Sequence, residues 1–74
     1  MLKKKSFRLD GHATSIALEP EFWQALTQIQ NQKHIKMDML ILSIDIQRDP
    51  QESLASALRV YCLNHYMDRE KVEK

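Results

Sequence analysis

The chain is poor in the residues that build many chemical sites. Its 74 residues include one cysteine, so an internal disulfide is excluded and cysteines alone cannot hold a metal cluster. It also has one glycine, which argues against a glycine-rich loop for nucleotide phosphates, because backbone approaches phosphate closely only where side chains are absent. We therefore expect no cofactor, no metal site and a reducing, cytoplasmic environment.

Long apolar runs are missing as well. No stretch reaches the roughly 18 to 20 residues of a membrane span, and the N-terminus lacks the apolar core of a secretory signal. Three histidines and ten acidic residues are scattered without a nucleophile beside a base, so we do not expect an enzyme. A domain this short buries little surface, which favours oligomerisation.

The net charge is only +1, but the charges are unevenly distributed. The first eight residues contain four basic side chains and no acid, whereas the other 66 residues carry a net charge of −3. Two such basic N-terminal arms in a dimer would attract a phosphate backbone by releasing counterions. On the arm alone, a solvated terminus is the better interpretation. The basic residues are Lys3, Lys4, Lys5 and Arg8.

A short strand followed by a helix dominates the N-terminal half. Ile16 and Leu18 alternate with small residues, which is the period of a strand, and Pro20 suits the first turn of a helix. Upstream, Phe7 and Leu9 alternate in the same way. Asp10-Gly11 can then be a two-residue hairpin turn, pairing Leu9 with His12 and Phe7 with Thr14, or a bulge in one longer strand. The sequence leaves both alternatives open.

The first helix is expected at 20–33, with Phe22, Ala25, Leu26 and Ile29 inward and Trp23 at the edge of this stripe as a packing anchor. The next segment, 36–48, is apolar nearly all round. Part of it alternates like a strand, but its length favours a helix that is buried on most sides, as in an intertwined dimer.

The third helix is expected at 50–68. Asp49 would cap it, Pro50 would lie in its first turn and Glu52 would reach back to the cap. Cys62 and His65 could face one metal ion, but two ligands do not make a site, and we interpret both as packing residues.

The order of these elements resembles the ribbon-helix-helix family, the MetJ/Arc group of dimeric DNA-binding proteins. The resemblance lies in 14–26, Thr-Ser-Ile-Ala-Leu-Glu-Pro-Glu-Phe-Trp-Gln-Ala-Leu, and covers about residues 5–66. Gly11-His12 and the segment 53–63 are similar to those of a short bacterial subgroup of mostly unassigned function. The resemblance implies a mainly helical homodimer with a short β-ribbon and an additional C-terminal helix.

Further implications follow from the family. Two strands would pair across the dimer axis, with Ala13, Ser15 and Ala17 facing the major groove of double-stranded DNA. The N-terminus of the second helix, near Lys36, would hold a phosphate. The chain departs from the family pattern, because alanine can touch only a thymine methyl group and Asp38 would repel phosphate. The implied dimer core is Ile16, Leu18, Phe22, Leu26, Leu40, Ile41 and Ile44.

The sequence therefore predicts one domain over 1–74, with a basic arm at 1–5, a strand or hairpin at 6–18 and helices at 20–33, 36–48 and 50–68. Its expected function is DNA binding by a homodimer, as a transcriptional regulator, with folding and association coupled. The alternative is a protein-interaction or antitoxin-like module that engages a partner through the third helix and has little affinity for DNA.

Overall fold

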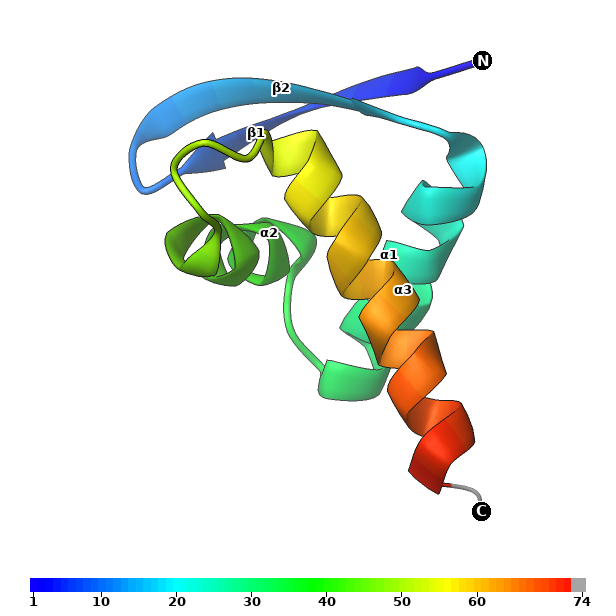
Figure 1. Cartoon of the computed structure of the whole chain (residues 1–74). Coiled ribbons are helices and arrows are strands. Elements are labelled where there is room, and N and C mark those ends of the chain that lie inside the picture. The colour runs from blue at the N-terminus through cyan, green and yellow to red at the C-terminus, as the bar shows by residue number, and fades with distance from the viewer. Residues whose placement is uncertain (73–74) are drawn as a thin grey trace.

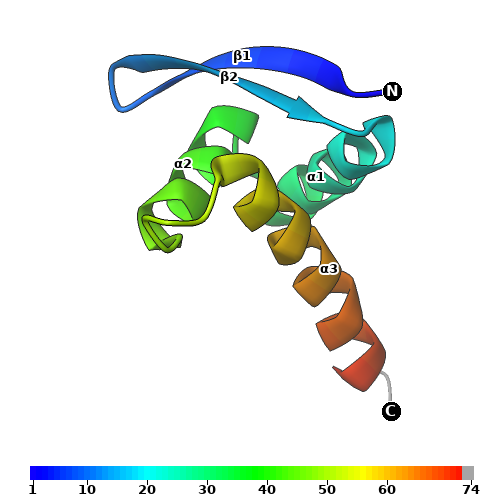
Figure 2. The same cartoon turned by 45° about the horizontal axis from the view of Figure 1, so that its top comes forward.

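A computed structural model describes residues 1–72 and shows a two-stranded antiparallel ribbon packed on three helices (Figure 1). The fold is mainly helical, as the sequence predicted. Figure 2 shows the ribbon lying across one side of the helices, while the last helix runs away from it. The elements are β1 (Lys3–Leu9), β2 (His12–Leu18), α1 (Pro20–Lys33), α2 (Met37–Gln47) and α3 (Leu54–Val72).

The two strands form a hairpin, which decides between the two alternatives left open by the sequence. Asp10 and Gly11 form its turn with φ angles of 51° and 84°, the left-handed pair that matches the twist of the flanking strands. Leu9 pairs with His12 and Phe7 with Thr14. Side chains directly opposite each other share a face, so the register fixes which residues of the two strands lie together.

The basic N-terminal segment is not a free arm. β1 begins at Lys3 rather than at residue 6, and Lys3, Lys4 and Lys5 pair with Leu18, Ala17 and Ile16. The expectation of an arm at 1–5 is therefore corrected for its last three residues. Their backbone completes the ladder along β2, whose N–H and C=O groups on that side need partners.

α1 joins the ribbon directly and presents an apolar stripe inward. Pro20 occupies the first turn, and Trp23, Leu26 and Ile29 are buried. The sequence placed Phe22 inside and Trp23 at the edge, but Trp23 is 4% exposed whereas Phe22 is only half-buried. The ribbon causes this exchange, because it covers the side of α1 on which the indole lies.

α1 ends at Lys33 and is capped by His34, which takes the left-handed conformation (φ 57°, ψ 42°) in which glycine is commoner. The N–H groups of His34 and Ile35 donate to the carbonyls of Asn31 and Gln30, so the end of the helix keeps its hydrogen bonds. This reversal brings α2 back under the ribbon.

α3 starts four residues later than the sequence predicted. Asp49 does accept a hydrogen bond, from the N–H of Gln51 at 2.9 Å, but this bond closes a turn rather than a helix. The Nη1 atom of Arg48 donates a hydrogen bond to the carbonyl of Glu52 at 2.6 Å. The helix is instead capped by Ser53, whose Oγ accepts from the N–H of Ser56 at 3.1 Å.

One core joins the ribbon to the helices. The residues assigned to a dimer core are buried within a single copy, apart from the half-buried Phe22. Their burial is therefore no argument for a second copy. The buried core consists of Leu9, Ile16, Leu18, Trp23, Leu26, Ile29, Leu40, Ile41, Ile44, Ala57, Leu58 and Cys62.

Candidate nucleic-acid interface

The outward face of the hairpin is basic and built from small or polar residues. The register places Lys4 opposite Ala17, Ser6 opposite Ser15 and Arg8 opposite Ala13. All six residues lie on the side of the ribbon away from the core, where five are exposed and Ala17 is half-buried. None of them is acidic, so this face carries two positive charges per chain.

The middle of this face is a hydroxyl pair. The Oγ atoms of Ser6 and Ser15 lie 3.0 Å apart across the strands. Each serine can also donate to or accept from a ligand, since a hydroxyl has one proton and two lone pairs. The Nη1 atom of Arg8 donates to the carbonyl of Gly11 at 3.2 Å, which holds the guanidinium near the turn.

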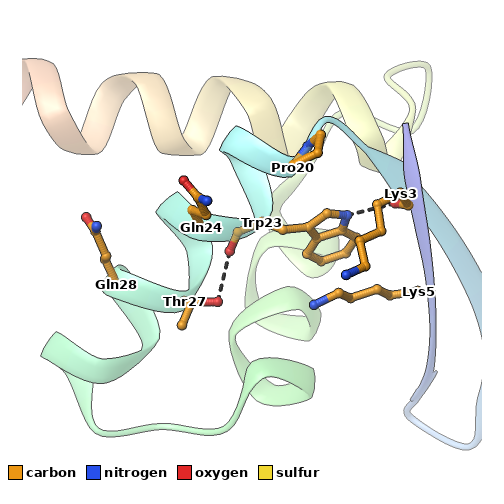
Figure 3. A pocket seen from close by; sticks show the side chains of 7 residues that line it. All are labelled: Lys3, Lys5, Pro20, Trp23, Gln24, Thr27 and Gln28. Atoms are coloured by element: carbon orange, nitrogen blue, oxygen red, sulfur yellow. Dashed lines mark hydrogen bonds between the residues drawn. The ribbon is translucent and has the colours of Figure 1, made fainter. Parts of the chain in front are cut away.

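Lys3 and Lys5 point the other way, toward α1 (Figure 3). The indole Nε1 of Trp23 donates to the carbonyl of Lys3 at 2.8 Å, and the Nζ atom of Lys5 lies 5.1 Å from the indole centroid. This last distance is within the range of a cation–π contact. These two lysines therefore belong to the junction between β1 and α1 rather than to the outward face.

The structure thus divides the basic residues that the sequence grouped as one arm. Lys4 and Arg8 join Ala13, Ser15 and Ala17 on the outward face, and Lys3 and Lys5 do not. Sequence reasoning missed Ser6 as a member of this face. The signal was available, because pairing Phe7 with Thr14 already places Ser6 opposite Ser15.

The start of α2 lies outside the ribbon face. Lys36 is exposed and occupies the N-cap position, where its side chain makes no capping hydrogen bond. The carboxylate of Asp38 instead accepts from the N–H of Met39 at 2.8 Å. One of the N–H groups that could bind phosphate is thereby already engaged, and a negative charge stands beside the others.

An ion pair fixes α3 against the corner between β2 and α1. The Nε atom of Arg59 lies 2.9 Å from Oε1 of Glu19, and its Nη2 atom donates to Oε2 at 3.3 Å. This pair of hydrogen bonds with the guanidinium lowers the pKa of Glu19 below its ordinary value. Arg59 also lies over the ring of Phe22, at 5.9 Å.

Cys62 and His65 lie in different surroundings. Cys62 is 3% exposed, and burial raises the pKa of its thiol to about 11. His65 faces Gln32, with Nε2 and Oε1 3.2 Å apart. Among the described side chains, no three His, Cys, Asp or Glu residues gather as metal ligands.

Comparison with protein families gives a match over most of the chain. A family model described as "Ribbon-helix-helix domain" matches residues 2–66. The chain belongs to this family. Searches of curated proteins and of solved structures gave no match. The ribbon-helix-helix family consists generally of DNA-binding regulators and antitoxins and is typically non-enzymatic.

In this ribbon-helix-helix chain, both strands of the ribbon belong to the same copy of the protein. The strand that carries the resemblance, β2, pairs along one edge with β1 of the same chain. None of the helices, over the residues described, combines the length and apolar character of a membrane crossing.

Proposed function

We propose that this ribbon-helix-helix protein binds double-stranded DNA as a homodimer and acts as a transcriptional regulator. The observation that carries the proposal is the outward face of the hairpin, where Lys4, Arg8 and a serine pair stand together without an acidic residue. A two-stranded antiparallel ribbon of this kind fits the major groove.

Dimerisation would use the edge of β2 that β1 does not cover. In a two-residue hairpin the residues next to the turn form a hydrogen-bonded pair, so alternate residues of β2 direct their N–H and C=O groups to the other edge. These are Ala13, Ser15 and Ala17. The opposite edge of the sheet, along β1, carries three lysines and an arginine, which discourage strand pairing. Two β2 strands would therefore pair with each other.

Pairing of the two β2 strands would join the two hairpins into one four-stranded sheet. The width of this sheet assigns a role to each strand. Strands lie about 4.8 Å apart, so each β1 would lie about 7 Å from the dimer axis. The major groove is about 12 Å wide, and its walls therefore lie about 6 Å from the same axis. The β2 strands would face base edges, and the β1 strands would lie over the phosphate backbones. Lys4 and Arg8 have the reach and charge for phosphate contacts.

Recognition of bases would then be modest. Ser15 is the hydrogen-bonding side chain of β2 on this face, and Ala13 and Ala17 can contact only thymine methyl groups. The alanines also let the central strands approach the groove floor closely. Lys36, at the exposed start of α2, would add a phosphate contact on the flank. Affinity would come mainly from phosphates, and sequence specificity would be low.

The test is a salt-dependent anisotropy titration against duplex DNA. Replacing Lys4 and Arg8 by alanine removes up to four phosphate contacts per dimer, so the slope of log K against log salt should fall by up to about 3.6 units. Binding should weaken for all sequences alike. Ser15→Ala should leave the slope unchanged and reduce only the preference among sequences.

The matched control is the double variant Lys3→Gln/Lys5→Gln. It removes the same number of charges from the same strand, but from the side that faces α1. It should keep a salt slope close to that of the parent. If both double variants lowered the slope equally, net charge rather than the ribbon face would drive binding.

A second candidate function is protein interaction through α3. Val60, Leu63 and Met67 are exposed at spacings of three and four residues, and so form an apolar stripe. The stripe borders a cavity of about 330 Å³ to which Phe22 and Tyr66 contribute. A helix with an apolar face fits such a groove. This function becomes the better proposal if the parent binds DNA without salt dependence.

A further inference from the structure

The junction of β1 and α1 holds a cationic cavity that the proposed DNA face does not use. It has a volume of about 410 Å³, within the range of sites for small molecules. Lys3 and Lys5 line it from the strand, and Gln24 and Gln28 line it from the helix (Figure 3). None of its lining residues is acidic.

Contacts with Trp23 position the ammonium group of Lys5 and the backbone of Lys3 at this cavity. The Nζ atom of Lys5 lies 5.1 Å from the centroid of the buried indole of Trp23, and the carbonyl of Lys3 accepts from the indole N–H. Two like charges around one cavity repel each other, and a bound anion would relieve this repulsion. The strand itself offers no such relief, since no acidic residue lies in β1.

The helix wall adds neutral hydrogen-bonding groups. Gln24 and Gln28 are four residues apart and therefore lie on the same face of α1. The Oε1 atom of Gln28 accepts from the hydroxyl of Tyr66 at 2.7 Å, which leaves the amide N–H groups of Gln28 as donors. A charge of +2 on the strand wall, beside neutral amides on the helix wall, matches an anion with several acceptor oxygens and two negative charges.

We propose that this cavity binds the phosphate group of a small phosphorylated molecule. A phosphate monoester carries close to two negative charges at neutral pH, which balances Lys3 and Lys5, whereas a carboxylate carries one. The volume leaves space for the group that bears the phosphate. The same chemistry is present in the phosphates of DNA, and the experiment separates the two sources. Phosphate binding at this cavity does not require DNA.

The single tryptophan of the chain supplies the signal. Trp23 emission is followed in the full chain without DNA, during titration with inorganic phosphate and with ribose 5-phosphate. Sodium chloride at equal ionic strength and ribose are the controls. We expect a saturable change in emission for both phosphates and none for the controls. Lys3→Gln/Lys5→Gln should weaken phosphate binding at least about tenfold, since each lost charged hydrogen bond is worth that much.

Lys4→Gln is the matched variant, because Lys4 lies on the same strand but faces outward. It should bind phosphate as the parent does, and circular dichroism checks that all variants are folded. Equal weakening by Lys4→Gln, or a response to chloride equal to that to phosphate, would overturn the proposal. If duplex DNA alone changed the emission, and did so through Lys3 and Lys5, the phosphate would come from DNA and the small-molecule site would be rejected.

Discussion

At the scale of single residues, Trp23 does more than its position in the sequence indicated. Its ring lies 5.9 Å from that of Phe7 and beneath Lys5, and its N–H is bonded to the carbonyl of Lys3. One side chain thus holds three residues of β1 against α1. A buried indole needs a partner for its N–H, and the strand backbone supplies one. The position of Lys3 and Lys5 follows from this anchor.

Cys62 gives a prediction at the same scale. Its thiol has a pKa of about 11 instead of the ordinary 9.0, because burial disfavours the thiolate. At pH 8 the thiolate fraction is then about a hundredfold smaller than in an unfolded chain, and the side chain is shielded as well. Alkylation by iodoacetamide at pH 8, followed by mass spectrometry, should be at least about a hundredfold slower in the folded protein.

The unfolded chain in urea at the same pH is the reference for this rate. Because the chain has one cysteine, any modification reports on this position alone. Equal rates in the folded and unfolded chain would mean that packing of α3 against the core does not bury the thiol as the structure shows.

At the scale of elements, short-range turn chemistry was predictable and competing caps were not. The Asp10-Gly11 turn and the phase of Phe7 and Leu9 followed from the sequence, because a two-residue turn fixes the register. The start of α3 did not follow. Asp49 and Ser53 are both good caps, and the choice between them depends on Arg48, which holds the carbonyl of Glu52 in the turn.

Residues of the candidate DNA site could be predicted where their position follows from the pairing register of β1 and β2. Ser15 was found from the alternation of β2, and Ser6 could have been. The division of the lysines could not be predicted, because β1 extends to Lys3 only by virtue of its pairing with Leu18 and the bond from Trp23. Contacts between residues about twenty positions apart leave no periodic signal in a single sequence.

The ion pair between Glu19 and Arg59 predicts an acid-dependent contact between elements. The pKa of Glu19 is lowered in the folded protein from about 4.5, first by its hydrogen bond to Arg59. A carboxyl group whose pKa is lowered on folding stabilises the folded protein at pH values above its pKa in the unfolded chain. This stabilisation is lost as the pH falls through its pKa in the folded protein. Glu19→Gln should therefore reduce stability at pH 7 and have little effect at pH 2, as measured by urea denaturation.

Glu21→Gln is the matched control, because Glu21 lies two residues away in the first turn of α1 and has no ion pair among the described side chains. It should lack the dependence on pH that Glu19→Gln shows. A loss of stability for Glu19→Gln that is the same at both pH values would show that the carboxylate charge is not what Arg59 stabilises.

At the scale of the whole molecule, the apolar character of α2 has two explanations that the sequence could not separate. Leu40, Ile41 and Ile44 pack within one copy, whereas Met39 and Ile46 are 55% and 73% exposed. Periodicity shows that a helix is apolar all round but not which chain covers each side. Ile46 lines a cavity of about 390 Å³ together with His12 and Thr14, so its exposed side chain lies beside β2.

Two substitutions on α2 should therefore have different results. Ile44→Asp places a charge in the core of one copy and should unfold the protein. Ile46→Asp should leave the helices intact and shift a dimer toward folded monomers. Circular dichroism measures the fold, and sedimentation measures the association state. A parent chain that sediments as a monomer at micromolar concentration would contradict the proposed dimer, and monomeric Ile46→Asp without helical structure would show that folding requires the second copy.

The hairpin also determines the order in which the molecule can be assembled. β1 and β2 are joined by two residues, and the pairs in their ladder lie at most fifteen positions apart. Contacts this close in the sequence cost little loop-closure entropy, and a hairpin forms in about 1–10 μs. Each chain's half of the surface proposed for DNA can thus form before two chains meet. Folding should be a first-order process, and subunits should exchange between dimers without passing through an unfolded chain.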